Sequence, residues 1–329
     1  MSYSASGVDI AAADQLKKFM ARLAPRTYGP QVLAGVGPFA GLFSLQGFKD
    51  PLLVASCDGV GTKVKVAALM DKYDTLGYDL VHHSVNDILT LGAQPLFFLD
   101  YIAMEKLEPS RVQGLFQGLV AACQGLGIAL LGGETAEMPG VYREGELDLV
   151  GFILGAVERD RILQGKNIQV GDRLLGLPSS GLHSNGYSLA RKVFGVEEPG
   201  ALDRVYPELG RPLGEVLLEP HRCYYAELKP LLGRVKALAH ITGGGLGGNL
   251  PRVLPKGLGA RIQRGTWPIP PIFPLIQALG PIAEGEMYRV FNMGVGMVAV
   301  ASPKEDLLPL LPGSAIIGEV VAGEGVRIE

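Results

Sequence analysis

The stretch Ser56-Cys57-Asp58-Gly59-Val60-Gly61-Thr62-Lys63 directly follows the apolar run Leu52–Ala55, which has the length of a strand. Gly59 and Gly61 can adopt backbone angles that other residues avoid, so their amide groups can approach a phosphate closely. Asp58 offers an oxygen ligand to a hard divalent cation. The segment therefore predicts an α/β fold in which a strand presents a nucleotide-phosphate and magnesium site. A P-loop has a different glycine spacing, and a plain Asp-Gly turn is the alternative.

Composition narrows the class of protein. The chain has 329 residues, more than one hydrophobic core usually organises, so two domains are expected. A formal net charge of -3 without a cluster of Lys and Arg argues against a nucleic-acid partner. The three cysteines have neither disulfide nor zinc-ligand spacing, and no apolar run is long enough for a membrane span. We therefore expect a cytoplasmic protein that binds neither nucleic acid nor membranes.

Strand-length apolar runs alternate with segments of helical period in the first half. The expected strands are Leu52–Ala55, Leu96–Leu99, Ile128–Leu131 and Val150–Val157. Ser110 can cap a helix that ends near Gly125. The apolar stripe of this helix consists of Val112, Leu115, Phe116, Leu119 and Cys123.

A turn around Gly165-Lys166-Asn167 precedes a new strand, Arg173–Leu177, and we place the domain boundary there. The prediction is two mixed α/β domains (α/β or α+β), residues 1–163 and 164–329. The second also mixes a helix, Tyr187–Phe194, with strands such as Val295–Ala301. The proline-rich segment Trp267–Pro274 is expected to be a connecting loop.

The segment Asp79–Leu91 predicts a second part of the magnesium site. On a helix, its apolar residues face the core and its polar residues share the opposite face, namely Asp79, His83, Asn86 and Thr90. A solvated helix face accounts for His82 and His83. Asp87 is different, because a metal-nucleotide site needs more than one oxygen ligand and this helix can pack beside the strand that carries Asp58. We therefore predict Asp58 and Asp87 as metal ligands.

A third glycine-rich turn, Gly132–Gly140, is expected after the strand Ile128–Leu131 and brings Gly133, Glu134 and Thr135. Ligands in α/β sheets lie outside the carboxyl ends of the strands, so the strand ends with Asp or Glu beside glycine are expected to form one site. Ordinary loop chemistry is the alternative for each turn alone.

The second domain has its own motifs. Ser179–Gly186 opens the helix at Tyr187, and a helix start suits a phosphate. Capping by Ser184 or Asn185 is the alternative, and it leaves His183 unexplained. The glycine-rich run His240–Asn249 is expected to wrap closely around a ligand or a neighbouring chain rather than form an element. For Phe291–Met297 we expect mainly a structural role.

Seven motifs in this order closely resemble the aminoimidazole ribonucleotide synthetase family, the cyclo-ligases of purine synthesis. They are Asp58–Lys63, Val85–Asp87, Gly92–Tyr101, Gly132–Gly140, His183–Ser188, His240–Gly245 and Phe291–Gly296. The resemblance covers nearly the whole chain, from Gly7-Val8-Asp9 to Gly318-Glu319-Val320.

The resemblance implies an ATP-dependent ring closure of formylglycinamidine ribonucleotide that releases ADP and phosphate, with Mg²⁺ as the metal. It implies a homodimer in which the first domains pair through their sheets, with the nucleotide site near the interface. The residues implied in catalysis are Lys63, Asp87, His183 and His240. Those implied in ATP binding are Asp58, Gly59, Gly61, Thr62, Lys63, Asn86, Gly133, Glu134, Thr135, Ser184 and Asn185.

Several positions depart from the family pattern. Gly37-Pro38-Phe39 stands where Gly-Gly-Phe is usual, Cys57 and His221 replace threonines, His82-His83 replace smaller or apolar residues, and Gly248 stands where glutamate is common. Selenophosphate synthetase and a hydrogenase-maturation protein, which share the superfamily, use cysteines that this chain lacks at the corresponding places. The glutamine-using amidotransferase of the preceding purine step is a further relative. Assignment to thiamine monophosphate kinase, another member of the superfamily, would not account for the motif His183–Gly186. The alternative from another class of protein is a scaffold that binds a nucleotide without catalysing a reaction.

Overall fold

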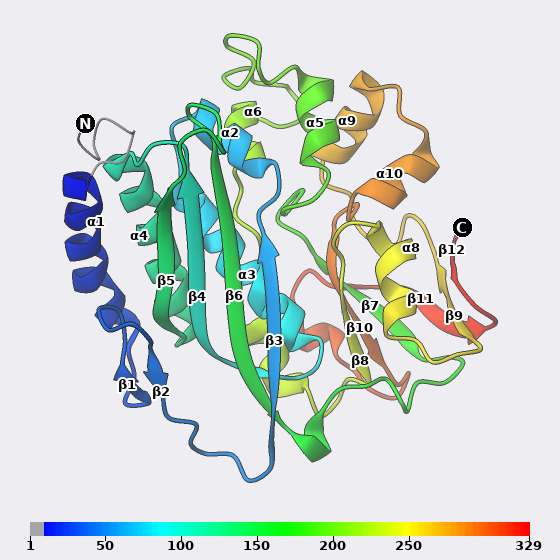
Figure 1. Cartoon of the computed structure of the whole chain (residues 1–329). Coiled ribbons are helices and arrows are strands. Elements are labelled where there is room, and N and C mark those ends of the chain that lie inside the picture. The colour runs from blue at the N-terminus through cyan, green and yellow to red at the C-terminus, as the bar shows by residue number, and fades with distance from the viewer. Residues whose placement is uncertain (1–9) are drawn as a thin grey trace. The chain divides into compact units, whose positions relative to one another are not determined.

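The computed structural model describes residues 10–329 and divides into two compact units (Figure 1). The first unit runs to Ile88 and continues over Gln94–Arg159, and the second comprises Leu89–Ala93 and Asp160–Glu329. The units thus separate a few residues before the expected boundary at 163/164. The short segment Leu89–Ala93 groups with the second unit, and the Leu163 amide donates a hydrogen bond to the Leu91 carbonyl. The start of the resemblance, Gly7-Val8-Asp9, lies outside the described residues.

The first unit is built on a four-stranded mixed sheet in the order β3-β6-β4-β5. Its strands are β3 (Pro51–Gly59), β4 (Gln94–Met104), β5 (Ala129–Glu137) and β6 (Leu147–Glu158). β4 and β5 are parallel, whereas β6 runs antiparallel to both β3 and β4. Consequently β3, β4 and β5 point the same way, and their carboxyl ends lie at one edge of the sheet.

The register of this sheet fixes where its acidic residues point. Asp58 pairs with Gly151, which pairs with Asp100 on its other side, and Asp100 pairs with Gly133. Residues that pair directly present their side chains to the same face, so both aspartates point to one face. Glu134 follows Gly133 on β5 and therefore points to the opposite face.

Helices α3 (Asp74–Leu89) and α4 (Pro109–Leu126) cover one face of the sheet (Figure 1). The predicted apolar stripe of α4 is buried in full, and the helix ends where Gly127 adopts a left-handed conformation with φ 67°. α3 approaches the sheet closely, because a Cβ atom added to Gly151 would lie 2.8 Å from Leu80.

The remaining elements of the first unit are shorter. α1 (Ile10–Leu23) packs on α4 through an edge contact of Phe19 with Phe116, whose ring centroids are 6.3 Å apart. The others are the helix α2 (Lys63–Leu69), the 3-10 helices η2 (Ala24–Thr27) and η3 (Arg159–Arg161), and the paired strands β1 (Val32–Ala34) and β2 (Leu42–Phe43).

No described helix of the first unit covers the other face of the sheet (Figure 1). By strand alternation Leu53 and Phe152 point to this face, and they are 61% and 36% exposed. Phe39 and Leu42 are exposed as well. Exposed apolar side chains gathered on one face are typical of an interaction surface.

The second unit contains a six-stranded mixed sheet in the order β12-β9-β11-β7-β10-β8, in which only the β12–β9 pair is parallel. Its strands are β7 (Arg173–Pro178), β8 (Ala237–His240), β9 (Leu258–Ile262), β10 (Val295–Ala301), β11 (Ala315–Ala322) and β12 (Val326–Ile328). Every residue of β10 is buried, as expected for a strand inside the sheet. The helices are α5 (Tyr187–Phe194), α6 (Leu213–Leu217), α7 (Tyr225–Leu228), α8 (Gly245–Asn249), α9 (Ile272–Leu279) and α10 (Glu284–Val290), with the 3-10 helices η4 (Lys229–Leu231), η5 (Leu250–Arg252) and η6 (Leu308–Leu310).

Four local expectations are wrong. Ser110 does not cap α4, which begins with Pro109 after Glu108 and has no side-chain cap bond. Gly132–Glu137 continues β5 instead of turning. The glycine-rich run after His240 does contain an element, the short helix α8. Pro274 lies in the first turn of α9, where the missing N–H costs no intrahelical bond.

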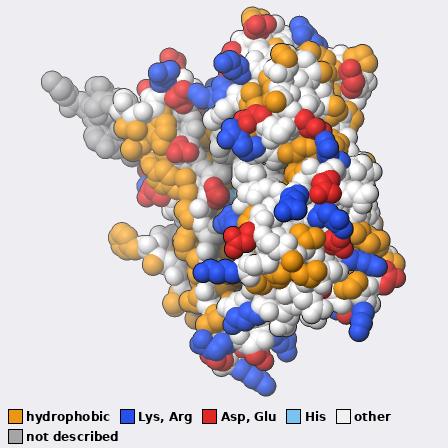
Figure 2. Space-filling model, turned by 90° about the vertical axis from the view of Figure 1, so that its right-hand side faces the viewer, with side chains coloured by type: hydrophobic (Ala, Val, Ile, Leu, Met, Phe, Trp, Pro, Cys, Tyr) orange, Lys and Arg blue, Asp and Glu red, His pale blue; other side chains and the backbone are white. Residues whose placement is uncertain are grey.

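The surface charges, the helices and the thiols can be described separately. On the face drawn in Figure 2, basic and acidic side chains are interspersed and no basic field gathers. Among residues 10–329, no helix combines the length and the apolar character that a bilayer crossing requires. Cys57, Cys123 and Cys223 are free thiols.

Candidate functional site

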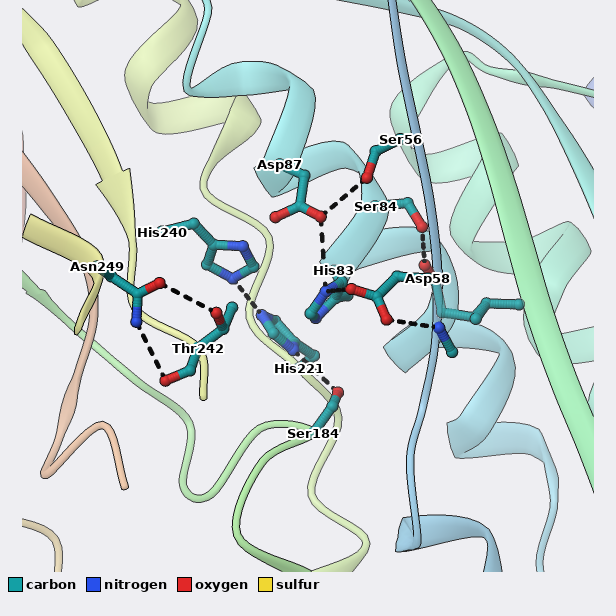
Figure 3. A network of polar contacts seen from close by, with 12 residues as sticks. Ser56, Asp58, His83, Ser84, Asp87, Ser184, His221, His240, Thr242 and Asn249 are labelled. Atoms are coloured by element: carbon teal, nitrogen blue, oxygen red, sulfur yellow. Dashed lines mark hydrogen bonds and ion pairs between the residues drawn. The ribbon is translucent and has the colours of Figure 1, made fainter. Parts of the chain in front are cut away.

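An acidic cluster forms where β3 faces α3 in the first unit. Nε2 of His83 lies 2.9 Å from Oδ2 of Asp58 and 3.6 Å from Oδ2 of Asp87. The hydroxyl of Ser56 donates a 3.0 Å hydrogen bond to Oδ2 of Asp87 (Figure 3). One ligand atom of each of Asp58, His83 and Asp87 lies within 4.8 Å of the other two. The structure thus brings the two predicted carboxylates together, and their role as metal ligands stays a prediction.

His83 is not part of a solvated helix face, which corrects the interpretation from the sequence. Its side chain is only 6% exposed, whereas those of Asp58 and Asp87 are 51% and 27% exposed. The hydrogen bond from His83 lowers the pKa of Asp58, against the opposing effect of partial burial. Burial of the imidazole opposes its protonation, but the hydrogen bond to Asp58 and the charges of Asp87, Asp58 and Asp79 raise the pKa of His83. The ring therefore orients both carboxylates from the protein side.

Of the two glycines after Asp58, only Gly61 has the left-handed backbone that the sequence predicts, while Gly59 ends strand β3. The Gly59 amide donates a 2.8 Å hydrogen bond to Oδ1 of Asp58. Gly61 has φ 58°, a conformation that favours glycine, and Thr62 occupies the N-cap position of α2 without a side-chain cap bond. Asn86 is fully buried on α3 beside Asp87.

Lys63 occupies a different place from the one expected of a phosphate ligand. Its side chain is fully buried, and Nζ lies 2.9 Å from Oδ1 and 2.7 Å from Oδ2 of Asp79, which is also fully buried. Asp79 was expected on the exposed face of α3. The structure therefore gives the Lys63 ammonium an internal counterion and no position at the surface of the loop.

A cavity of about 490 Å³ lies beside β5 in the first unit. Its lining combines the apolar side chains of Leu16, Met20 and Phe116 with Asp100, Gly133, Glu134 and Thr135, and with Gly37-Pro38 of the altered loop. Burial raises the pKa of Asp100 to about 7, with a smaller contribution from the Glu134 charge. A Cβ at Gly133 would lie 2.5 Å from Oδ1 of Asp100, so only glycine fits there.

The acidic cluster and this cavity are separate within the first unit. Asp58 lies on β3 and Glu134 on β5, and two strands stand between them. Three strand spacings of about 4.8 Å make this distance on the order of 14 Å. Within one first unit, the ends of β3 and β5 thus carry two separate features, and their joining into one site stays a prediction.

Three histidines meet in the second unit. His183 follows β7, has an unusual φ of 62°, and accepts a 3.1 Å hydrogen bond at Nε2 from the Ser180 amide. Its ring stacks on His221 with centroids 3.9 Å apart. Nε2 of His221 lies 3.1 Å from Nε2 of His240, and Nδ1 lies 3.3 Å from Oγ of Ser184 (Figure 3). The structure thus gathers the predicted His183, Ser184 and His240 around a residue that the prediction omitted.

Two asparagines hold the loops that carry these residues. Asn249 donates from Nδ2 to the carbonyls of Thr242, Gly243 and Gly245, at 3.3, 3.2 and 2.8 Å. Asn292 accepts from the Ser179 hydroxyl at 3.0 Å and donates to the Gly181 carbonyl at 2.8 Å. The structural role expected of the Phe291–Met297 motif is therefore specific: it fixes the loop before His183.

The α5 start differs from a capped turn. Gly186 occupies the cap position in a left-handed conformation, and no side chain bonds the helix start. Ser184 instead bonds His221, and Oδ1 of Asn185 faces the glycine-rich loop, 3.3 Å from where a Cβ of Gly243 would lie.

Some of the residues that sequence reasoning missed had a sequence signal. His83 is four residues from Asp87 on one helix, so their contact was predictable once the helix was placed. Asp100 lies within the quoted motif Gly92–Tyr101, but its register opposite Gly133 is a property of the sheet. His221 has no local signal, because its partners come from loops far away in the sequence.

Comparisons with known proteins agree with this geometry. Residues 40–157 match the family model AIR synthase related protein, N-terminal domain, and residues 169–329 match its C-terminal domain. The phosphoribosylformylglycinamidine cyclo-ligase of Geobacillus thermodenitrificans is 50% identical over 336 residues, covering 99% of this chain and 97% of the relative. That of Myxococcus xanthus is 51% identical over 335 residues, covering 98% and 97%.

A solved structure extends the likeness to the fold. Thiamine-monophosphate kinase from Stenotrophomonas maltophilia K279a superposes with a TM-score of 0.69 at 17% identity, covering 98% of this chain and 97% of that one. The two matched domains and their mixed sheets define an AIR synthase related protein. Within that class, the chain belongs to the phosphoribosylformylglycinamidine cyclo-ligase family, which confirms the resemblance of its motifs.

Proposed function

We propose that this chain closes the imidazole ring of aminoimidazole ribonucleotide from formylglycinamidine ribonucleotide, with ATP converted to ADP and phosphate. It is then an ATP-dependent ligase that forms a C–N bond in purine synthesis. The observation that carries the proposal is the identity of 50% with a cyclo-ligase across 99% of the chain. The clusters around Asp58 and His240 supply the two kinds of chemistry that this reaction needs.

The reaction needs activation of a poor leaving group. A formyl amide oxygen leaves slowly, but transfer of the terminal phosphoryl group of ATP converts it into phosphate, and an amidine nitrogen of the same substrate can then attack the carbon. Such a reaction depends on positioning and on neutralising charge. No protein nucleophile is required.

The acidic cluster fits Mg²⁺. Two carboxylates that face solvent and lie within 4.8 Å of a common third group are the oxygen ligands that this ion prefers. Asp58 and Asp87 would hold the ion, and Mg²⁺ supplies neutralisation of phosphate charge when bound. His83 and Ser56 orient the carboxylates, and the amides of Gly59, Gly61 and Thr62, with Asn86, support phosphate binding.

The cavity beside Asp100 supports a role for Gly133, Glu134 and Thr135 in binding the rest of the nucleotide. In the second unit, Ser184 and Asn185 are assigned to ligand binding, and His183 and His240 to proton transfer, since imidazole titrates near neutrality. Lys63 stabilises the loop through Asp79 instead of touching phosphate. This last assignment replaces the catalytic role that the sequence alone had predicted.

A homodimer accompanies this function. The uncovered face of the first sheet exposes Leu53 and Phe152, and a second copy of the same face is the partner that would cover them. A nucleotide site near that interface would explain why one first unit keeps the acidic cluster and the cavity apart.

One assay tests the function. ADP release is measured with ATP and Mg²⁺, with and without formylglycinamidine ribonucleotide, and aminoimidazole ribonucleotide is assayed in parallel. Substrate-dependent ADP release with an equal yield of ring-closed product supports the proposal. Release without dependence on this substrate, or no release, points to a kinase for another substrate or to a scaffold.

A further inference from the structure

Asp100 is a buried residue that lines the cavity of the first unit. It is only 6% exposed, and the lining of this cavity comes from α1, α4, β4 and β5 (Figure 1). Its Oδ1 lies close to Gly133, because a Cβ atom added to that glycine would lie 2.5 Å from this oxygen. Gly133 is exposed and lines the same cavity. The carboxyl group therefore lies beside the space that a ligand in the cavity would occupy.

The surroundings of Asp100 favour its neutral form. Burial raises the pKa of Asp100 to about 7, and Glu134 is the one charged side chain among the described residues that acts on this pKa, also raising it. Lys17 and Lys18 line the cavity as well, but both are exposed on α1. Burial raises the pKa of the Cys123 thiol on α4, so this neighbour stays neutral. Without a cation beside it, a buried carboxyl group keeps its proton more readily than an exposed one.

A neutral carboxyl group has a hydrogen-bonding pattern that a carboxylate lacks. Its hydroxyl donates and its carbonyl oxygen accepts, whereas a carboxylate only accepts. Adenine offers the complementary pair, because its 6-amino group donates beside a ring nitrogen that accepts. Guanine can pair with a neutral carboxyl group through O6 and N1–H, but its 2-amino group would then lie in apolar surroundings without a partner. The neutral carboxyl group therefore favours adenine.

The walls of the cavity suit the ring of a purine. Leu16 and Met20 of α1 and Phe116 of α4 line it with apolar surface. Thr135 lies two residues after Gly133 on β5, so its side chain shares the face to which Asp100 points. A cavity of this volume with apolar walls and a few polar groups is typical of a small-molecule site.

We propose that Asp100 determines the nucleotide specificity of this chain, because its carboxyl group accepts a hydrogen bond from the 6-amino group of adenine and donates one to a ring nitrogen of the base. This inference rests on the proposed function and deepens it, since it names the residue that selects ATP among nucleoside triphosphates. An ionised Asp100 cannot donate, so only the protonated protein binds ATP well. The affinity for ATP therefore falls as the pH rises through the pKa of Asp100.

The first measurement is the binding of three nucleotides to the wild type. Equilibrium titrations with Mg²⁺ at pH 7, without formylglycinamidine ribonucleotide, compare ATP, GTP and purine riboside triphosphate, which lacks the 6-amino group. We expect ATP to bind about 10- to 100-fold more tightly than either of the other two, since each of them leaves a polar group in the cavity without its partner. Equal affinities for the three nucleotides would overturn the proposal.

The second measurement compares variants. Asp100→Asn keeps a donor and an acceptor but has no proton to lose, and we expect its affinity for ATP at pH 7 to be within about threefold of the wild type. Asp100→Leu removes both, so ATP should bind about 10- to 100-fold more weakly and lose its advantage over GTP. The control is Asp14→Leu, at an exposed position of α1 outside the cavity lining. Unchanged selectivity in Asp100→Leu would refute the assignment.

The third measurement is the pH dependence of ATP binding. From pH 7 to pH 8.5 the affinity of the wild type should fall about tenfold or more relative to that of Asp100→Asn, and the same pH dependence in both proteins would overturn the proposal. If Asp100→Leu does not fold, this comparison decides. Selective binding of ATP without ring closure would refute the proposed function alone. Ring closure with equal kcat/KM for ATP and GTP would refute this inference alone.

Discussion

Lys63 and Asp79 form a fully buried ion pair, with Nζ of the lysine 2.7 Å from Oδ2 of the aspartate. The pair joins the first residue of α2 to α3, and therefore connects the loop after Asp58 to the helix that carries Asp87. The lysine of the Asp58–Lys63 motif is thus held by an internal counterion.

Removing one partner of this pair should destabilise the protein. Lys63→Met leaves the Asp79 charge buried without its ammonium, and we expect a loss of about 3–5 kcal/mol in the free energy of unfolding. Lys63→Met combined with Asp79→Leu should recover most of that loss. Denaturant unfolding measures the stability of both variants, and the ATP affinity of the double variant tests the role of Lys63. Near-normal ATP affinity indicates that Lys63 stabilises the loop. A large loss of ATP affinity in a stable double variant would indicate that Lys63 contacts the phosphates.

Asp87→Asn should weaken the magnesium site and leave the fold intact. A neutral amide replaces a charged oxygen ligand, so the Mg²⁺ concentration for half-maximal activity should rise by about tenfold or more, with a large fall in turnover. Magnesium titrations of the ADP-release rate measure this. Glu144→Gln, at an exposed acid outside the cluster, is the matched control. Normal turnover with unchanged magnesium dependence in Asp87→Asn would contradict the assignment.

Asp100 should make stability depend on pH. Its folded-state pKa of about 7 lies above the ordinary value of 3.8, so the folded protein keeps a proton that the unfolded chain releases. Stability from this group is present below pH 4 and is lost as the pH rises to about 7, by up to about 4 kcal/mol. Asp100→Asn should lack this loss and gain stability relative to the wild type between pH 4 and 7. If the free energy of unfolding of the two proteins had the same pH dependence, Asp100 would have an ordinary pKa in the folded protein.

The uncovered sheet face should hold two copies of the chain together. Charges introduced there by Leu53→Asp with Phe152→Asp would have to be buried, so we expect a monomer at micromolar concentration where the wild type is a dimer. Analytical ultracentrifugation measures the difference. Val170→Asp changes an equally exposed apolar residue of the second unit and should leave the dimer intact. A monomeric, fully active wild type would remove the basis for an interfacial nucleotide site.

The mechanism predicts the fate of one oxygen atom. If ATP activates the formyl oxygen directly, that oxygen leaves as phosphate. Substrate labelled with ¹⁸O at the formyl group should therefore give labelled inorganic phosphate, detected by mass spectrometry. Label found in water would mean dehydration without phosphorylation, and the phosphoryl-transfer roles of Asp58 and Asp87 would have to be abandoned.

The periodicity of the sequence was sufficient for elements whose burial follows from their own pattern. The strands β3 to β6 and the buried stripe of α4 were predictable because each buries a face that its own residues define. The boundaries of these elements were less predictable. β5 continues through Gly132 and Gly133, since pairing with β4 overrides the preference of glycine for turns.

Parts of the site depend on contacts between residues far apart in the sequence, which a local sequence pattern cannot predict. Asp58 and Asp87 could be paired on chemical grounds, but the burial of Lys63 against Asp79 depends on how α2 meets α3. The separation of Asp58 from Glu134 depends on strand order, which places β6 and β4 between them. His221 reaches His240 only through the packing of loops in the second unit.

The pairing of β3 with β6 also determines when the first unit can fold during synthesis. β3 pairs only with β6 among the described strands, and Asp50 and Arg159, 109 residues apart in the chain, form an ion pair at the end of that ladder. On the ribosome, β3 therefore waits for β6 to emerge before its backbone finds a partner. Such long-range closure is slow and leaves an apolar strand exposed on the nascent chain. We expect this stretch of the nascent chain to be the part that most needs a chaperone.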